Sequence, residues 1–152
     1  MSKKSKILVI LQFSIFAFFA IAGKLFTFNY FWLAIQLIGL AIGAWGILAM
    51  KMGNFNIQPE VKQHASMVTS GPYKIIRNPM YTGLLLFFGV SVLVNFSMDK
   101  LLFSLLRLAI FIILTIVLLL KIKMEEQFLS TKFGDTYAQF KAKTYRLIPF
   151  IY

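Results

Sequence analysis

The chain has 152 residues, of which 59% are apolar and only 14% are Asp, Glu, Lys or Arg, against about 25% charged residues in an ordinary soluble domain. This composition argues against a water-soluble fold, and with a mean hydropathy of +0.79 the formal net charge of +11 indicates membrane topology rather than nucleic-acid binding. A chain with no cysteine and one histidine has no disulfide, no thiol catalysis and no cysteine-based or multi-histidine metal site.

Four apolar segments separated by charged residues predict four membrane helices. About 20 apolar helical residues are enough to cross the ~30 Å hydrocarbon layer. The expected helices cover about residues 7–27, 31–50, 80–98 and 101–120. The first is distinguished from a signal peptide because residues 13–20 lack a small-residue cleavage motif. The sequence therefore predicts an all-α polytopic membrane protein that forms a single domain over residues 1–152.

The basic residues predict how these helices are oriented. Of the 16 Lys and Arg residues, 13 lie before the first helix, between the second and third, or after the fourth. Since such residues are retained on the cytoplasmic side, both termini, a loop over 51–79 and a tail over 121–152 are expected on the cytoplasmic face of an inner membrane. Arg107 is expected near the outer end of its helix. The end of the loop and the start of the tail then lie at one membrane level and can share a site.

Small residues recur along the second predicted helix, where Gly39, Gly43 and Gly46 are three or four positions apart. No strand precedes them, which argues against a nucleotide-binding glycine loop. Small residues at this spacing let membrane helices approach closely. The pattern favours helix packing.

The loop ends in polar residues that suit an anion. Asn78 followed by Pro79 is typical of an N-cap with proline at the first helical position. Such a helix start offers backbone N–H groups to a carboxylate or phosphate, and Arg77 beside it could add a bidentate donor. Arg77 equally suits a positive anchor at the membrane surface, so both interpretations stay open.

The tail begins with two acidic residues, Glu125 and Glu126, just after the fourth predicted helix. One carboxylate could bind a ligand ammonium or ribose hydroxyls. A solvated helix turn, or an ion pair between Lys121 and Glu125 four positions apart, are the alternatives. Apolar residues at helical spacing follow and predict an amphipathic tail at the interface. Gly134 is expected to divide this tail into two short helices.

Two segments, VTSGPYKIIRNPMYTG at 68–83 and EEQFLSTKFGDTYAQFKAKTYRLIP at 125–149, resemble the cytoplasmic signatures of the isoprenylcysteine carboxyl methyltransferase family, which is related to the phospholipid methyltransferases. That family's pattern reads roughly TSGxYxxxRHPxYxG, then a helix hairpin, then EE followed by FGxxYxxY and a late IP. The resemblance covers about residues 51–150. It implies an integral membrane enzyme that uses S-adenosylmethionine without a Rossmann-type domain, and an acceptor such as an isoprenylcysteine-like or lipid carboxylate.

The resemblance also implies which residues form the site. Those implied to line or contact the cofactor pocket are Gln58, Met67, Val68, Tyr73, Asn78, Pro79, Met80, Tyr81, Glu125 and Glu126. Lys121 stands where the family has a basic residue facing the acceptor, and it is a candidate catalytic residue together with Arg77. Asn78 departs from the family, whose better-known members have His there, because Asn donates a hydrogen bond but does not titrate.

The charges of S-adenosylmethionine match these side chains. Its carboxylate suits Arg77 and the helix N-terminus, and its ammonium and ribose suit the Glu125–Glu126 pair. Its sulfonium suits the faces of Tyr73 and Tyr81 through cation–π contact. These residues are therefore expected to contribute to one cofactor site.

Two other functions stay open at this stage. One is a non-catalytic membrane interaction protein of the same fold, and the other is a related membrane reductase that uses NADPH. The chain shows no basic cluster suited to a 2′-phosphate. The acceptor is also open among a lipid amine, a lipid carboxylate and a small hydrophobic thiol or phenol that enters from the bilayer. Membrane lipids are the expected partners and nucleic acid is not, while the sequence leaves the oligomeric state undetermined.

Overall fold

The computed structural model describes residues 3–23, 25–54 and 66–152. Its helices are α1 (Lys3–Ile21), α2 (Tyr30–Asn54), α3 (Pro79–Val94) and α4 (Leu101–Ala142), with a short 3₁₀ helix, η1 (Gly71–Lys74). Over the described ranges there is no β-strand, and one isolated parallel bridge joins Ile76 to Tyr145. The all-α prediction is confirmed. By length and composition, α1, α2 and α4 could each cross a membrane, whereas α3 is a shorter apolar helix.

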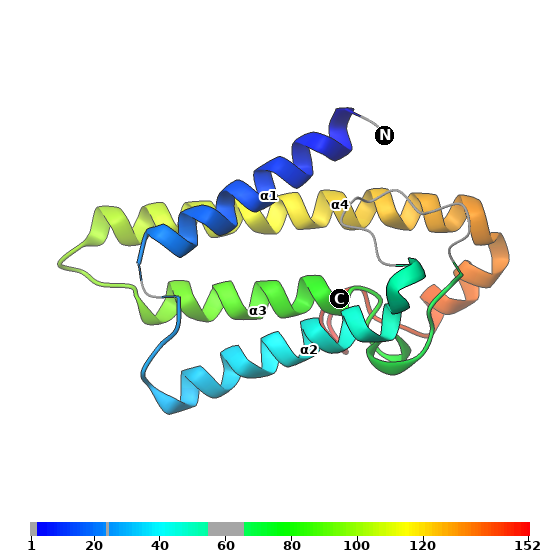
Figure 1. Cartoon of the computed structure of the whole chain (residues 1–152), viewed down its shortest axis with the longest axis horizontal. Coiled ribbons are helices and arrows are strands. Elements are labelled where there is room, and N and C mark those ends of the chain that lie inside the picture. The colour runs from blue at the N-terminus through cyan, green and yellow to red at the C-terminus, as the bar shows by residue number, and fades with distance from the viewer. Residues whose placement is uncertain (1–2, 24, 55–65) are drawn as a thin grey trace.

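The helices are arranged so that the end of the loop, over residues 66–79, meets the tail. Figure 1 shows α1 crossing along α4 and α2 lying along α3, with the ends of α1 and α3 and the starts of α2 and α4 together at the opposite end of the molecule. The core joins α1, α3 and α4 through residues such as Phe19, Phe88 and Leu118. Half of α3 is buried, which explains why this short helix is apolar on all sides.

The helix ends differ from the predicted ones. α1 covers 3–21 rather than 7–27, and α3 ends at Val94 rather than at 98. The largest difference is in α4, which continues past residue 120 to Ala142. Charged residues mark the edge of a bilayer, but they do not interrupt backbone hydrogen bonding, so the helix leaves the membrane without ending. Gly134 breaks its regular geometry with φ 49°, as a residue without a Cβ can. The predicted division of the tail at Gly134 is confirmed as a kink, but the part before the kink is the continuation of α4 rather than a separate short helix.

Glycines bring α2 and α3 into close contact, as the sequence predicts. A Cβ on Gly39 would lie 3.0 Å from the carbonyl oxygen of Gly83, and a Cβ on Gly46 would lie 3.0 Å from Cγ of Pro79. Larger residues at these positions would push the two helices apart. The small-residue pattern is thus a packing motif, and it places the start of α3 directly against α2.

Arg107 lies in the second turn of α4, near one end of the helix as expected, and its side chain is buried inside the bundle. It is 1% exposed, and its guanidinium donates to the carbonyl of Ala22 at 3.0 Å and to Oγ of Ser91 at 3.0 Å. The guanidinium also lies 5.3 Å from the ring centroid of Phe19. The end of α1 offers carbonyl groups that lack helical partners, so Arg107 connects α4 to α1 and α3 inside the bundle.

Candidate functional site

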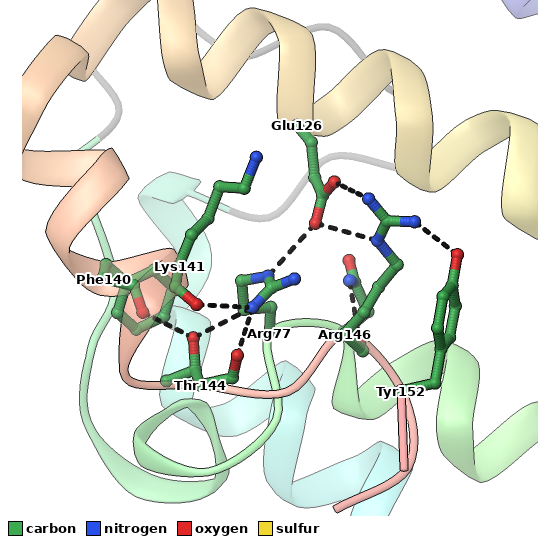
Figure 2. Close-up of polar contacts among 8 residues, drawn as sticks. Arg77, Glu126, Phe140, Lys141, Thr144, Arg146 and Tyr152 are labelled. Carbon is green, nitrogen blue, oxygen red and sulfur yellow. Dashed lines mark hydrogen bonds and ion pairs between the residues drawn. The ribbon is translucent and has the colours of Figure 1, made fainter.

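An acidic side chain from α4 joins the loop to the tail. Nε of Arg77 lies 3.1 Å from Oε1 of Glu126, and Nη2 of Arg146 lies 2.7 Å from Oε2. Glu126 has 8% of its side chain exposed. Figure 2 shows the carboxylate held between the two guanidinium groups. The predicted juxtaposition of the Arg77 and Glu125–Glu126 segments is therefore present.

Backbone contacts strengthen the same junction. The N–H of Arg77 donates to the carbonyl of Tyr145 at 2.8 Å, and the N–H of Tyr145 donates to the carbonyl of Ile75 at 2.9 Å. Nη1 of Arg77 donates to the carbonyls of Lys141, at 3.2 Å, and of Thr144 (Figure 2). The guanidinium thus holds the tail in place, a role that neither sequence interpretation of Arg77 included. Its predicted contact with the cofactor stays a prediction.

Asn78 precedes α3, but its side chain makes no capping hydrogen bond. Instead, Nδ2 donates to the carbonyl of Arg146 at 3.0 Å, and Oγ1 of Thr82, one turn further along, donates to the carbonyl of Leu147 at 2.8 Å. The predicted N-cap position, with proline at the start of α3, is confirmed, but the side chain of Asn78 does not form the cap. The amide of Asn78 is taken up by the returning tail, whose carbonyl groups would otherwise be buried without donors.

Glu125 faces different surroundings from its neighbour. The hydroxyl of Tyr81 donates to Oε1 of Glu125. Although the residue as a whole is partly exposed, burial of its carboxyl group raises the pKa to about 7, against the lowering effects of Tyr81 and Lys121. Among the described residues, this is the carboxyl group whose pKa burial brings close to neutral pH.

Tyr73 adds a buried hydroxyl beside Glu125 and Tyr81, and we call these three residues the Glu125 corner. The residue is 4% exposed, and its hydroxyl has no hydrogen-bond partner among the described residues. Burial, and then the charge of Glu125, raise the pKa of Tyr73 well above its ordinary value. A buried polar atom without a partner costs free energy, so this corner is suited to a polar ligand that satisfies it.

An apolar cavity of about 430 Å³ lies beside the same corner. Its walls come mainly from glycines and apolar residues of α2 and α3, Met80 among them. The polar side chains that line it are Gln12, Tyr81 and Lys121. Nζ of Lys121 donates to Oε1 of Gln12 at 2.6 Å and lies 5.4 Å from the ring centroid of Tyr81. Tyr81 thus contributes its ring to the cavity and its hydroxyl to Glu125.

The structure describes all but one of the remaining predicted site residues. Met67 and Val68 are half-buried in the coil before η1, and Pro79 packs on Gly46. Gln58 lies outside the described residues. Two residues absent from the predicted site take part in it, because Arg146 binds Glu126 and Gln12 binds Lys121. A polar residue inside a charge-free membrane span is the signal that could have revealed Gln12.

The sequence model of the phospholipid methyltransferase family matches residues 20–136, which is most of the chain. The chain belongs to the phospholipid methyltransferase family. No curated protein matches it. As a family member with long apolar helices, it is an integral membrane protein of the methyltransferase class. The matched range includes Arg77, Lys121 and Glu125. It leaves out most of α1 and the part of this phospholipid methyltransferase family member that follows residue 136.

Proposed function

We propose that this protein transfers a methyl group from S-adenosylmethionine to the carboxylate of a membrane-embedded acceptor. The observation that carries the proposal is the position of Tyr81. Its ring lines the apolar cavity beside Lys121, while its hydroxyl binds Glu125. A lipid-soluble acceptor and a water-soluble methyl donor could therefore meet on the two sides of one tyrosine, which is the proximity that methyl transfer requires.

The residues of the Glu125 corner suit this cofactor. Glu125 presents a carboxyl group whose ionised form is poorly solvated, and Tyr73 presents a buried hydroxyl that has no partner among the described residues. A ligand that brings an ammonium, a sulfonium and ribose hydroxyls would satisfy both groups. Glu125 would hold the ammonium, and the face of Tyr73 or Tyr81 would lie against the sulfonium. Arg77 is the proposed donor to the cofactor carboxylate.

The cavity suits an anionic acceptor with an apolar body. Its walls can take a hydrocarbon chain, and Lys121 places a positive charge at its polar end. We infer that Lys121 orients the acceptor carboxylate beside Tyr81. When bound, the cofactor supplies a methyl group that moves from its sulfur to the acceptor oxygen and leaves a neutral thioether. An acceptor carboxylate carries no proton to be removed, so an asparagine at position 78 is compatible with this reaction.

The distribution of basic residues supports a cytoplasmic site. Loop 51–79, the tail and the N-terminal segment carry most of the Lys and Arg residues, and these are retained on the cytoplasmic side of an inner membrane. The ion pair of Arg77 with Glu126 joins the end of this loop to the tail. This orientation would expose the Glu125 corner to the cytoplasmic pool of the cofactor.

Calorimetry of the purified protein in nanodiscs tests the proposal. S-adenosylmethionine should bind at one site, and NADPH should not. At 100 times its dissociation constant the cofactor should stabilise the folded state by about 2.7 kcal/mol. Deuterated-methyl cofactor incubated with membrane extracts should yield a labelled ester. Binding of NADPH alone would favour the membrane reductase, and binding of neither nucleotide would favour a non-catalytic membrane protein.

The ionisation of Glu125 should make cofactor affinity depend on pH. The pKa of this carboxyl group is about 7, so the ionised form that binds an ammonium becomes populated as the pH rises. A ligand α-ammonium, whose pKa is about 7.7–8.0, stays charged below that range. We therefore expect affinity to increase about tenfold from pH 5.5 to 7. Titrations by calorimetry in buffers of different ionisation enthalpy should show proton release on binding. A flat profile with no proton release would contradict the role of Glu125.

A further inference from the structure

We propose that the last residues of the chain dock on the surface of a lipid bilayer that contains anionic phospholipids. Residues 147–152, which we call the C-terminal turn, follow the last helix and return to the start of α3. They lie outside the family match, which ends at residue 136. The inference concerns how the tail is held at the membrane, so it does not depend on the methyl transfer proposed above.

The C-terminal turn is closed by its own backbone and presents apolar side chains outward. The N–H groups of Leu147 and Ile148 donate to the carbonyl of Tyr152 at 2.8 and 2.9 Å. Phe150 and Ile151 are nevertheless 85% and 79% exposed. Phe150 also has φ 66°, in the left-handed region that a bulky residue rarely adopts and that costs free energy. A fold that holds a phenylalanine outward at this cost favours an apolar partner for it.

Contacts with α3 place the C-terminal turn at the level where that helix begins. Oγ1 of Thr82, in the first turn of α3, donates to the carbonyl of Leu147. The chain carries no charged residue from Asn78 to Met98. Since charged side chains are costly inside the hydrocarbon layer, α3 enters this layer close to its first residue. The C-terminal turn therefore lies at the boundary between the hydrocarbon layer and the lipid head groups.

An exposed tryptophan marks the same depth independently. Trp45 of α2 is exposed, and a Cβ on Gly71 would lie 3.2 Å from its Nε1. Its neighbour Gly46 packs on Pro79, the first residue of α3. Tryptophan is enriched where the bilayer meets water. The end of α2, the start of α3 and the C-terminal turn are thus all consistent with one interfacial level.

Basic side chains near the C-terminal turn provide charge complementarity to anionic lipids. The N–H of Tyr145 donates to the carbonyl of Ile75, and the ring of Tyr145 lies 5.2 Å from that of Phe150. Lys74 precedes Ile75, and Lys143 comes two positions before Tyr145. The two lysines line one cavity, and the described residues around it include threonines and no acidic side chain. Lysines beside apolar side chains suit a layer of phosphate groups over hydrocarbon.

Docking of the C-terminal turn also restrains the tail where it binds α4. Nη1 of Arg146 donates to the hydroxyl of Tyr152, and Nη2 of the same side chain lies 2.7 Å from Oε2 of Glu126 (Figure 2). One guanidinium thus connects the C-terminal turn to the buried carboxylate that joins loop and tail. Attachment of the turn to the bilayer would limit the motion of this junction.

Fluorescent labels on the full chain test the depth of the C-terminal turn. The sequence has no cysteine, so Phe150→Cys and Ile151→Cys each give one labelling site for nitrobenzoxadiazole. Two positions are used so that a folding defect in one variant leaves the other. The membranes are nanodiscs of phosphatidylcholine alone, and of phosphatidylcholine and phosphatidylglycerol in equal parts. Ala138→Cys, at an exposed position beyond the kink at Gly134, is the control.

Both labels in the C-terminal turn should be quenched by a nitroxide on the lipid acyl chain and protected from acrylamide in the water. The label at Ala138→Cys should show the reverse. Emission from the turn should shift to shorter wavelength when phosphatidylglycerol is included, and high salt should remove this shift. Lys74→Gln combined with Lys143→Gln should also remove it, while the labels stay quenched in phosphatidylcholine.

Equal access of acrylamide to the turn and to the control position would overturn the inference. Labels that behave alike with and without phosphatidylglycerol would overturn it too, because the lysines would then have no part in docking. Protection from both quenchers, with energy transfer between labelled copies, would assign the C-terminal turn to a contact between two copies of the chain instead. None of these outcomes bears on cofactor binding, which is measured separately by calorimetry.

Discussion

Glu126→Gln should lower the free energy of unfolding by about 3 kcal/mol, because it leaves two guanidinium groups without their anion. Breaking a buried ion pair by removing one partner costs about 3–5 kcal/mol. We expect the lower end of this range of free energies because 31% of the Arg146 side chain is exposed, compared with 10% for Arg77. Arg77 would keep its hydrogen bonds to tail carbonyls, but its ion pair would be lost. Unfolding by increasing dodecyl sulfate in mixed micelles measures the change.

The same variant tests whether Glu126 binds the cofactor, as the resemblance implies. The structure places its carboxylate against Arg77 and Arg146, which favours a structural role. A variant at the exposed Asp99, placed at the opposite end of the molecule between α3 and α4, is the control and should have the stability of the parent protein. If Glu126→Gln keeps the parent stability but loses cofactor affinity, Glu126 is a ligand-binding residue and the structural assignment is wrong.

Glu125→Gln should weaken binding of S-adenosylmethionine about 100-fold, which corresponds to about 2.7 kcal/mol. The substitution keeps the size of the side chain and removes the charge proposed to hold the ligand ammonium. Hydrogen bonds to charged groups contribute about 1.5–3 kcal/mol, so an effect of this size is expected from the loss of one such contact. Calorimetry at pH 7 measures it. Unchanged affinity would exclude Glu125 from the cofactor site.

Glu125→Gln should weaken cofactor binding, but it should increase the stability of the folded protein at high pH. The pKa of Glu125 is about 7, above its ordinary value of about 4.5, so the folded state holds this proton more tightly than the unfolded state. The contribution of the carboxyl group to stability is therefore present below about pH 4.5 and is lost as the pH rises through 7. Glu125→Gln should raise the unfolding midpoint at pH 8 and change it little at pH 5. A lower midpoint at pH 8 would show that the ionised carboxylate stabilises the fold.

The helices could be predicted from the sequence more fully than their ends. Long charge-free runs are sufficient to identify apolar helices because hydropathy is a property of many residues together. Helix ends depend on single residues and on contacts that are remote in the sequence. Lys121 marks the expected end of a membrane segment, yet α4 continues through it. The sequence places Arg107 near one end of its helix, but it does not show that the carbonyl of Ala22, after the end of α1, makes burial of the guanidinium possible.

The site could be predicted by region but not by contact. The sequence singles out Arg77, Glu125 and Glu126, but it does not show which pairs form. Glu125 and Glu126 are neighbours in the chain, and successive positions on a helix differ by about 100° in direction. One carboxylate therefore meets Tyr81 and the other meets Arg77. That difference depends on where α3 and the returning tail lie, which no local pattern contains.

The continuity of α4 also has a consequence for how the two substrates are spaced. Lys121 and Glu125 are one turn apart on a single helix, about 6 Å along its axis. The distance between the proposed acceptor side and the proposed cofactor side is thus determined by helical backbone hydrogen bonds and does not require a moving domain. Substitutions that loosen the tail are expected to change how easily ligands reach the site, while the separation of the reacting groups is preserved.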